Sequence, residues 1–348
     1  MGFRLPVAAT RVFRLGLTTA LTLACAYALD VPLPFIAPIL AFALGIKPAP
    51  PIPLKQSIAL LIGLGMITGS GLLLLPILTQ YTAAGLAIIA LGLFVANYIS
   101  VQLGKGAVGS LLTVGLTLIT AAGYGSFQTG RMVVEALILG MALALVCQRI
   151  VYPLLPEPAG TAPAPAAPPQ SPDNAKWIAL RATLIVYPTF LLGLFNPSAY
   201  LPIIMKAVSL GQQTTLTSAK SAGRELLGST IMGGLFAIGF WFSLGVMTNL
   251  WMFFLCMLAS ASYFAAKIYR IFPTSYSPGF WVNTCITMLI LLGPAVQDTA
   301  SGKDVYKAFA VRISLFIAVT LYAWLALHAL ESLRQWQQLR AAKTATPC

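Results

Sequence analysis

The chain has 348 residues, of which 58% are apolar and only 8% charged, and its mean hydropathy is +0.87. Soluble globular proteins carry about 25% charged residues, so this composition excludes an ordinary water-facing surface and predicts a protein that lies in a lipid bilayer. The formal net charge of +13 comes from Lys and Arg residues that stand singly between apolar runs. This pattern excludes a basic nucleic-acid-binding patch.

Charge-free runs bounded by Pro, Gly or charged residues predict an all-α protein with twelve helices that cross the membrane. The runs of the first half are Leu15–Leu29, Leu33–Ile46, Ser57–Leu78, Thr82–Val101, Ala107–Ala122 and Met132–Val151. The runs of the second half are Trp177–Phe195, Ser198–Leu210, Leu226–Val246, Leu250–Ala266, Pro278–Leu292 and Tyr306–Leu330. Since two runs are short, a count of ten is the alternative.

A Pro- and Ala-rich stretch separates the two sets of helices and is typical of a linker, because it lacks a hydrophobic period. The predicted units are a first six-helix repeat at 1–152, a linker at 153–175, a second six-helix repeat at 176–335 and a tail at 336–348. Ser171 and Pro172 suit the N-cap and first position of the helix that follows. The charge-free stretch between Glu225 and Lys267 is too long for one helix, and we expect it to turn at Thr248-Asn249.

The distribution of basic residues predicts the orientation in the membrane. With the N-terminus in the cytoplasm, seventeen of the 21 Lys and Arg residues fall on the cytoplasmic side. This bias agrees with the positive-inside rule. Both termini and the linker are therefore expected in the cytoplasm.

The two halves resemble each other along the chain. The matching residues are Arg14 with Arg181, and Pro32 and Pro38 with Pro197 and Pro202. Because each half has an even number of helices, the copies should point the same way, related by an axis along the membrane normal. The second run of each half is short and contains or follows prolines, and a helix of 14 residues spans only about 21 Å. Such paired segments favour a transport site, although a tight outer hairpin with a thin helix is the alternative.

Charged side chains inside a bilayer are costly and usually functional. The candidate residues for a solute route are Lys206, Arg312, Arg224, Lys220, Arg14, Arg181, Glu135, Arg131 and Glu225. Most of them are cations, so the route should favour anions. The spacing of Arg131 and Glu135 lets them pair on one helix face, and Glu135 could instead meet Arg312 across the two halves. Snorkelling of the basic side chains to the interface is the alternative for each cation.

Small residues and cysteines are given structural roles. Close helix packing is predicted at Gly65, Gly69, Gly228 and Gly233. The five cysteines lack metal-ligand spacing and the chain has one histidine, so we expect no metal, no cofactor and no catalytic residue. The sequence therefore favours a protein that is not an enzyme.

The sequence Pro34-Phe-Ile-Ala-Pro38-Ile-Leu, the stretch Arg224-Glu-Leu-Leu-Gly228-Ser-Thr-Ile-Met-Gly233 and the last helix with Arg312 resemble the fusaric acid resistance protein and aromatic acid exporter superfamily. The resemblance is to its short branch without large soluble domains. It implies export of aromatic or other organic acids across the bacterial inner membrane. It also implies a periplasmic membrane-fusion adaptor and an outer-membrane channel as partners. Ser229 departs from the family pattern, which has Thr after the glycine.

The function expected from the sequence is thus a multi-pass transporter for small anionic solutes. Glu135 or Glu225 could carry a proton that drives it, whereas an anion channel would need no such group. The alternative from another class is a membrane scaffold that transports nothing and recruits an adaptor of an envelope complex.

Overall fold

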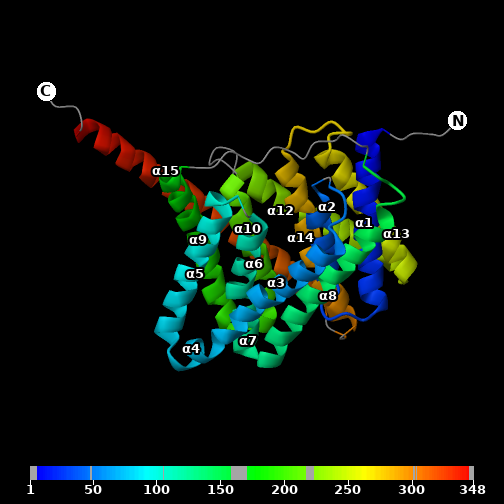
Figure 1. The fold of residues 1–348 in the computed structure, drawn as a ribbon, viewed down its shortest axis with the longest axis horizontal. Coiled ribbons are helices and arrows are strands. Elements are labelled where there is room, and N and C mark those ends of the chain that lie inside the picture. The colour runs from blue at the N-terminus through cyan, green and yellow to red at the C-terminus, as the bar shows by residue number, and fades with distance from the viewer. Residues whose placement is uncertain are drawn as a thin grey trace.

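The computed structural model describes residues 6–47, 49–104, 106–157, 171–216, 223–300, 302 and 304–344. Within these residues the chain is helical and has no strand, which confirms the all-α prediction (Figure 1). The helices before the linker are α1 (Val7–Ala28), α2 (Ile36–Gly45), α3 (Leu54–Leu73), α4 (Leu75–Gln80), α5 (Thr82–Gln102), α6 (Gly106–Val114), the π-helical turn η1 (Gly115–Ile119), α7 (Thr120–Gly125) and α8 (Phe127–Val151). The helices after it are α9 (Pro172–Phe195), α10 (Pro197–Leu216), the π-helical turn η2 (Gly223–Leu227), α12 (Gly228–Val246), α13 (Leu250–Ile268), α14 (Pro278–Ala300) and α15 (Val305–Thr344).

All twelve predicted runs correspond to helical segments when α3 is joined to α4, α6 to η1 and α7, and η2 to α12. Across the described ranges, nine of these segments are long and apolar enough to cross a membrane. α2 is short and apolar, while α1 and α10 carry more polar side chains. The chain is therefore a helical bundle of the multi-pass membrane type.

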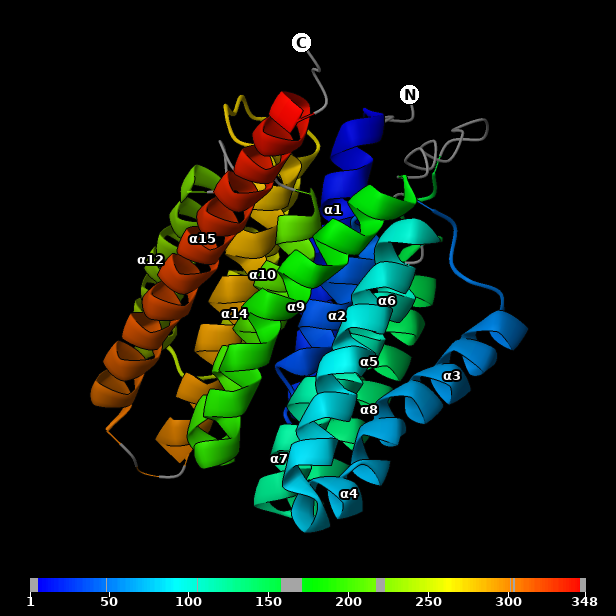
Figure 2. The same ribbon diagram turned by 90° about the vertical axis from the view of Figure 1, so that its left-hand side faces the viewer.

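The helices run between two ends of the bundle. At one, the terminal end, α1 begins and α15 finishes; at the opposite, far end lie the α1–α2 and α14–α15 connections (Figure 2). The turn expected at Thr248-Asn249 is also at the far end and is confirmed. There the side chain of Asn249 accepts a hydrogen bond from the backbone N–H of Met252 at 2.7 Å and caps α13.

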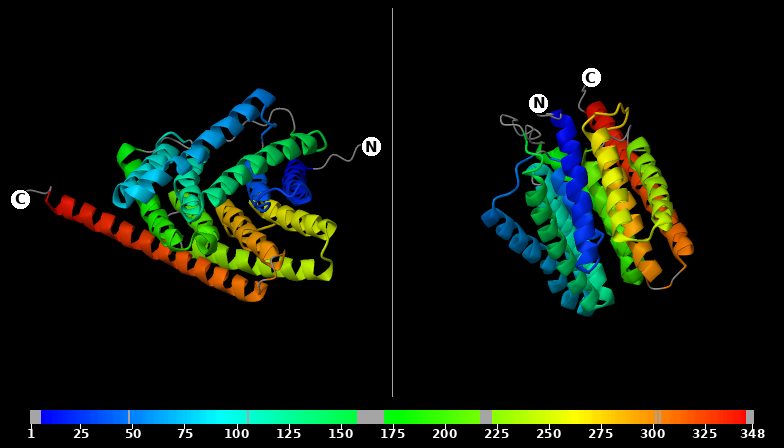
Figure 3. Two further views of the ribbon diagram at one scale, coloured as in Figure 1. Left: turned by 90° about the horizontal axis from the view of Figure 1, so that it is seen from below. Right: turned by 90° about the vertical axis from the view of Figure 1, so that its right-hand side faces the viewer.

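The N-terminal half (α1–α8) and the C-terminal half (α9–α15) lie side by side but exchange contacts (Figure 3). α1 packs along α13 of the other half, and α5 packs along α9. Within each half the second helix packs against the last, α2 against α8 and α10 against α15. The interior of the bundle is therefore shared between the halves, and the candidate site lies in it.

Several helices are longer than the apolar runs that predicted them, among them α10, α14 and α15. α10 has 20 residues rather than the short segment predicted from its prolines. Pro197 occupies its first position, where no intrahelical N–H bond is lost, and Pro202 removes only one bond near the start. α14 continues past Leu292 to Ala300, and α15 continues through the predicted tail to Thr344. With 40 residues α15 is about 60 Å long, and its last part projects beyond the bundle (Figure 1).

Close packing at the predicted glycines is uneven. A Cβ atom at Gly233 would lie 2.7 Å from the Cβ of Thr287 on α14. At Gly228 and Gly65 it would lie 3.2 Å from a phenylalanine and an isoleucine side chain, respectively. Gly69 has no atom of a neighbouring helix within 4 Å, so the packing prediction is wrong at this position because that face of α3 is open.

Candidate functional site

A cavity of ≈350 Å³ is lined by residues of both halves, among them residues of the α1–α2 connection and of α14 and α15 near the far end. The N-terminal half contributes the α1–α2 connection and parts of η1 and α8, and the C-terminal half contributes α10, α14 and α15. The lining residues are Leu33, Phe35, Ile36, Leu118, Val133, Leu201, Pro202, Met205, Pro294, Gln297, Asp298 and Arg312. Both proline-containing segments singled out in the sequence therefore border it, through Leu33 to Ile36 and through Pro202.

The mainly apolar lining of the cavity contains an ion pair between Arg312 and Asp298. Nη2 of Arg312 lies 2.6 Å from Oδ2 of Asp298, and the two side chains are 17% and 9% exposed. Arg312 sits two turns inside α15, and Asp298 lies in the last turns of α14. The second terminal nitrogen of Arg312, Nη1, is buried and has no hydrogen-bond partner among the described residues. A residue that lines the cavity thus carries a buried donor atom without an acceptor among the described residues.

Lys206 lies next to the cavity-lining Met205 on α10 and is fully buried. Its Nζ donates hydrogen bonds to Oγ1 of Thr287 at 2.7 Å and to Oδ1 of Asn283 at 3.3 Å. Asn283 Oδ1 also accepts from Ser209, and its Nδ2 donates to Ser229 at 2.6 Å. Within the described ranges, these partners of Lys206 are neutral. The C-terminal half therefore encloses a polar cluster built around one cation.

Arg224 and Glu225 lie in η2, at the terminal end of the same helix group. Ser277 donates a hydrogen bond to Oε2 of Glu225 at 2.5 Å. Arg224 donates to Ser275 at 3.0 Å and stacks over the ring of Tyr276, 4.5 Å from its centroid. These two residues tie η2 to the segment before α14 and are separate from the cavity. Lys220 lies outside the described residues.

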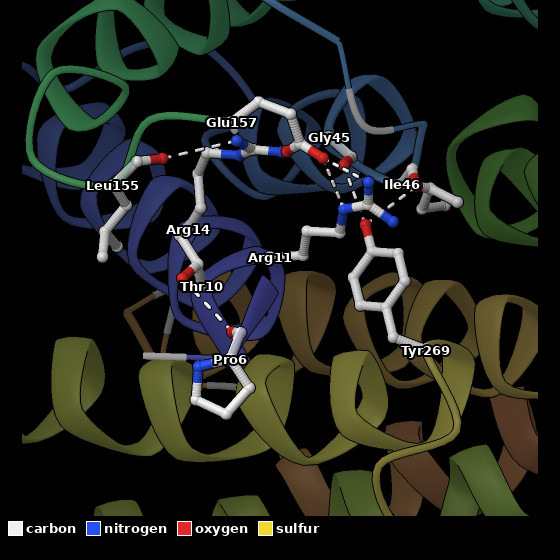
Figure 4. A network of polar contacts seen from close by, with 9 residues as sticks. All are labelled: Pro6, Thr10, Arg11, Arg14, Gly45, Ile46, Leu155, Glu157 and Tyr269. Atoms are coloured by element: carbon white, nitrogen blue, oxygen red, sulfur yellow. Dashed lines mark hydrogen bonds and ion pairs between the residues drawn. The ribbon is translucent and has the colours of Figure 1, made fainter. Parts of the chain in front are cut away.

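Arg14 belongs to a network at the terminal end (Figure 4). Its Nη2 lies 2.7 Å from Oε2 of Glu157, while Arg11 pairs with the other oxygen of the same carboxylate. Tyr269, just after α13, donates to the carbonyl oxygen of Ile46 at 2.8 Å. Burial raises the pKa of Glu157, but the hydrogen bonds from both arginines outweigh it and hold the pKa below its usual value. The network joins α1, α2, α13 and the segment after α8.

Arg181, the counterpart of Arg14 in the second half, also pairs with a glutamate near the end of its own half. Its Nη1 lies 2.6 Å from Oε1 of Glu331 on α15, and Trp177 donates to the same oxygen at 3.4 Å. Arg334 donates to Asn174 at 3.0 Å nearby. Each half thus carries a buried arginine on its first helix that is neutralised at the terminal end.

Arg131 and Glu135 form the pair expected from their spacing, with Nε and Oε1 2.7 Å apart. Their side chains are 62% and 44% exposed, so they lie on the outside of the bundle. The alternative meeting of Glu135 with Arg312 is wrong, because Arg312 pairs with Asp298. Of the charged candidates that the structure describes, Arg312 alone lines the cavity, and Lys206 follows the lining residue Met205 on α10.

Sequence reasoning missed the acidic partners Asp298, Glu157 and Glu331. Asp298 was hidden because the predicted helix ended at Leu292, which placed it in a loop. The sequence feature that could have identified it is the rarity of acidic residues, since Asp298 is one of only 8 in the chain and lies six residues after the apolar run that ends at Leu292. Glu157 lies in the predicted linker, where a carboxylate is ordinary and does not indicate an ion pair with the helices.

Comparison with known protein families gives a match over part of the chain. The family model described as "Protein of unknown function (DUF2955)" matches residues 11–151, which correspond to α1 through α8. No curated protein and no solved structure matches the chain. Over its N-terminal half the chain is therefore similar to a family whose function has not been assigned.

Proposed function

We propose that this protein transports small anionic solutes across a membrane and binds them in the cavity between its two halves. The observation that carries the proposal concerns Arg312, which lines a solute-sized cavity and whose buried Nη1 has no hydrogen-bond partner among the described residues. Charged side chains within a membrane bundle commonly mark substrate pathways. Lys206, which follows the cavity-lining Met205 on α10, adds a second buried positive charge to the interior of the bundle.

The cavity suits an organic acid with an apolar body. Its volume of ≈350 Å³ lies in the range of small-molecule sites, about 300–1,000 Å³, which combine apolar walls with a few polar groups. Phe35, Leu201, Met205 and Pro294 offer apolar surface, and Arg312 offers the charge. An aromatic acid, which the sequence resemblance also suggested, has both features.

The packing supports a transporter made of two like-oriented six-helix repeats. The first helix of each half packs against the fourth segment of the other, as α1 on α13 and α5 on α9. The second helix packs against the last in both halves, and Arg14 and Arg181 pair with Glu157 and Glu331 at the same end. A site at the interface of two repeats is accessible from alternate sides when the repeats rock against each other.

For location and direction, we propose export across a bacterial inner membrane, with the terminal end in the cytoplasm. The bias of basic residues supports this orientation, and the cavity then lies toward the outside. An interior-negative potential is worth about 2.3 kcal/mol per charge per 100 mV and drives an anion outward. A periplasmic membrane-fusion adaptor and an outer-membrane channel are the proposed partners.

Flux from proteoliposomes tests the proposal. Vesicles loaded with benzoate are placed under an imposed membrane potential, and efflux is followed for the wild type and for Arg312→Gln. We expect efflux by the wild type, loss in Arg312→Gln and normal efflux in the matched control Arg131→Gln, which alters an exposed pair. Absence of wild-type flux for a panel of aromatic acids would overturn the proposal and favour a membrane scaffold.

A further inference from the structure

The Asp298–Arg312 pair occupies only part of what the guanidinium offers. Nη2 of Arg312 contacts Oδ2 of Asp298 at 2.6 Å, while Nη1 is buried and has no partner in the described part of the chain. A guanidinium presents its nitrogens as a planar fork that matches the two oxygens of one carboxylate. The ion pair in the cavity therefore engages only one of the two terminal nitrogens of Arg312.

We propose that Asp298 is a tethered carboxylate that holds the solute's place on Arg312 while the site is empty, and that the solute head group is a carboxylate. The proposal rests on the proposed transport function and concerns the same site. A free carboxylate can take both nitrogens of Arg312, whereas Asp298, fixed to α14, takes one. The incoming acid displaces Asp298 because two charge-assisted hydrogen bonds replace a single ion contact between Nη2 of Arg312 and Oδ2 of Asp298, whose geometry is not that of a hydrogen bond.

The role of Asp298 in the empty state follows from the cost of a buried charge. A guanidinium left alone in a dry interior costs several kcal/mol, which would oppose any movement of the two halves with an empty site. Asp298 neutralises Arg312 and removes that barrier. It is thus a positioning residue that permits the unloaded protein to return, and it competes with the solute for the same group.

Few other described charges lie near this ion pair. Among the residues that line the cavity, Asp298 and Arg312 carry the charges and Gln297 is the further polar side chain. On the helices packed against α14, Lys206 bonds to Thr287, three turns away from Asp298, and Lys307 of α15 is exposed. Lys267 and Glu225 lie toward the terminal end, where α13 finishes and α12 begins.

Binding and flux of Asp298→Asn and Asp298→Glu test the proposal. The protein is placed in lipid nanodiscs and titrated with benzoate, benzenesulfonate and benzamide. We expect wild-type affinity in the order benzoate, benzenesulfonate, benzamide, because only the carboxylate matches the fork. Asp298→Asn removes the competitor and should bind benzoate roughly 10- to 100-fold more tightly. Asp298→Glu, which keeps the charge and guards against a folding defect, should stay within about threefold of the wild type.

The second readout is the ratio of net efflux to exchange in proteoliposomes. Asp298→Asn should slow net efflux, which requires the empty protein to return, and leave benzoate–benzoate exchange intact. Asp304→Asn, which alters an exposed aspartate at the start of α15, is the control and should match the wild type. Weaker benzoate binding in Asp298→Asn, or an unchanged ratio of net efflux to exchange, would overturn this inference. A wild type that neither binds nor moves benzoate would instead overturn the proposed function.

Discussion

Replacement of the buried Lys206 tests whether its charge serves transport or stabilises the fold. The side chain is fully enclosed and makes two hydrogen bonds to neutral groups, Thr287 and Asn283. Burial of an ammonium costs several kcal/mol, and each hydrogen bond returns about 1 kcal/mol. The lysine also loses about 2 kcal/mol of side-chain entropy. On balance, the buried ammonium of Lys206 lowers the free energy of unfolding.

Lys206→Met removes the charge and keeps the length of the side chain. No acceptor is orphaned, because Asn283 Oδ1 still receives the hydroxyl of Ser209, and Thr287 donates to the carbonyl oxygen of Asn283. We therefore expect the free energy of unfolding to rise by about 1–3 kcal/mol. Lys206→Ala also removes the stem from a packed interior and should fall about 2–5 kcal/mol below Lys206→Met. Benzoate flux should be lost in both variants.

The assay is thermal and denaturant unfolding of the three purified proteins in the same nanodiscs, with flux measured in parallel. The expected order of stability is Lys206→Met, wild type, Lys206→Ala. A Lys206→Met protein less stable than the wild type by more than about 1 kcal/mol would refute the reasoning. It would mean that the ammonium is compensated and that its place in the interior is structural.

Two further predictions concern stability. Glu157→Gln breaks the pairs with its two arginines and should lower the free energy of unfolding by about 1–3 kcal/mol at pH 7. Because the pKa of Glu157 is lowered in the folded chain, its contribution is present above the ordinary carboxyl pKa of about 4.3 and is lost as the pH falls further. The difference in the free energy of unfolding between Glu157→Gln and the wild type should therefore shrink when the pH is lowered from 7 to about 2.5, well below the ordinary carboxyl pKa. An equal difference at both pH values would contradict this account. Gly233→Ala brings a methyl group against Thr287 and should destabilise by about 1–3 kcal/mol. Gly239→Ala, on the same helix with no atom within 4 Å, should be neutral or slightly stabilising, and equal unfolding temperatures would argue against close packing of α12 on α14.

Much of the fold could be predicted because apolar runs and turn residues are local signals. The turn before α13 was located from Asn249 and a length argument, and the structure confirms it. Helix ends were missed where polar residues continue a helix, as at Gln297 and Asp298 in α14 and after Trp336 in α15. Hydropathy detects the apolar part of a helix, whereas backbone hydrogen bonds extend it through polar residues as well.

The cations of the candidate site could be predicted from the sequence, but their partners could not. Lys206 and Arg312 stand out in the sequence because a charge in an apolar run is costly. Their surroundings do not, since Asn283 and Thr287 reach Lys206 from another helix and Asp298 reaches Arg312 from the preceding one. Such partners are brought together by tertiary packing, and no local spacing encodes them.

The exchange of contacts between the halves bears on how the protein is made. Synthesis proceeds from the N-terminus, so α1 and α5 enter the membrane before α13 and α9, which cover them. Until those helices arrive, lipid must cover the faces that later become interior, which is tolerated because lipid tails are as apolar as the side chains they replace. Insertion of the helices and assembly of the bundle are therefore separate events. The N-terminal helices can be fully inserted before the cavity forms, because the cavity needs both halves.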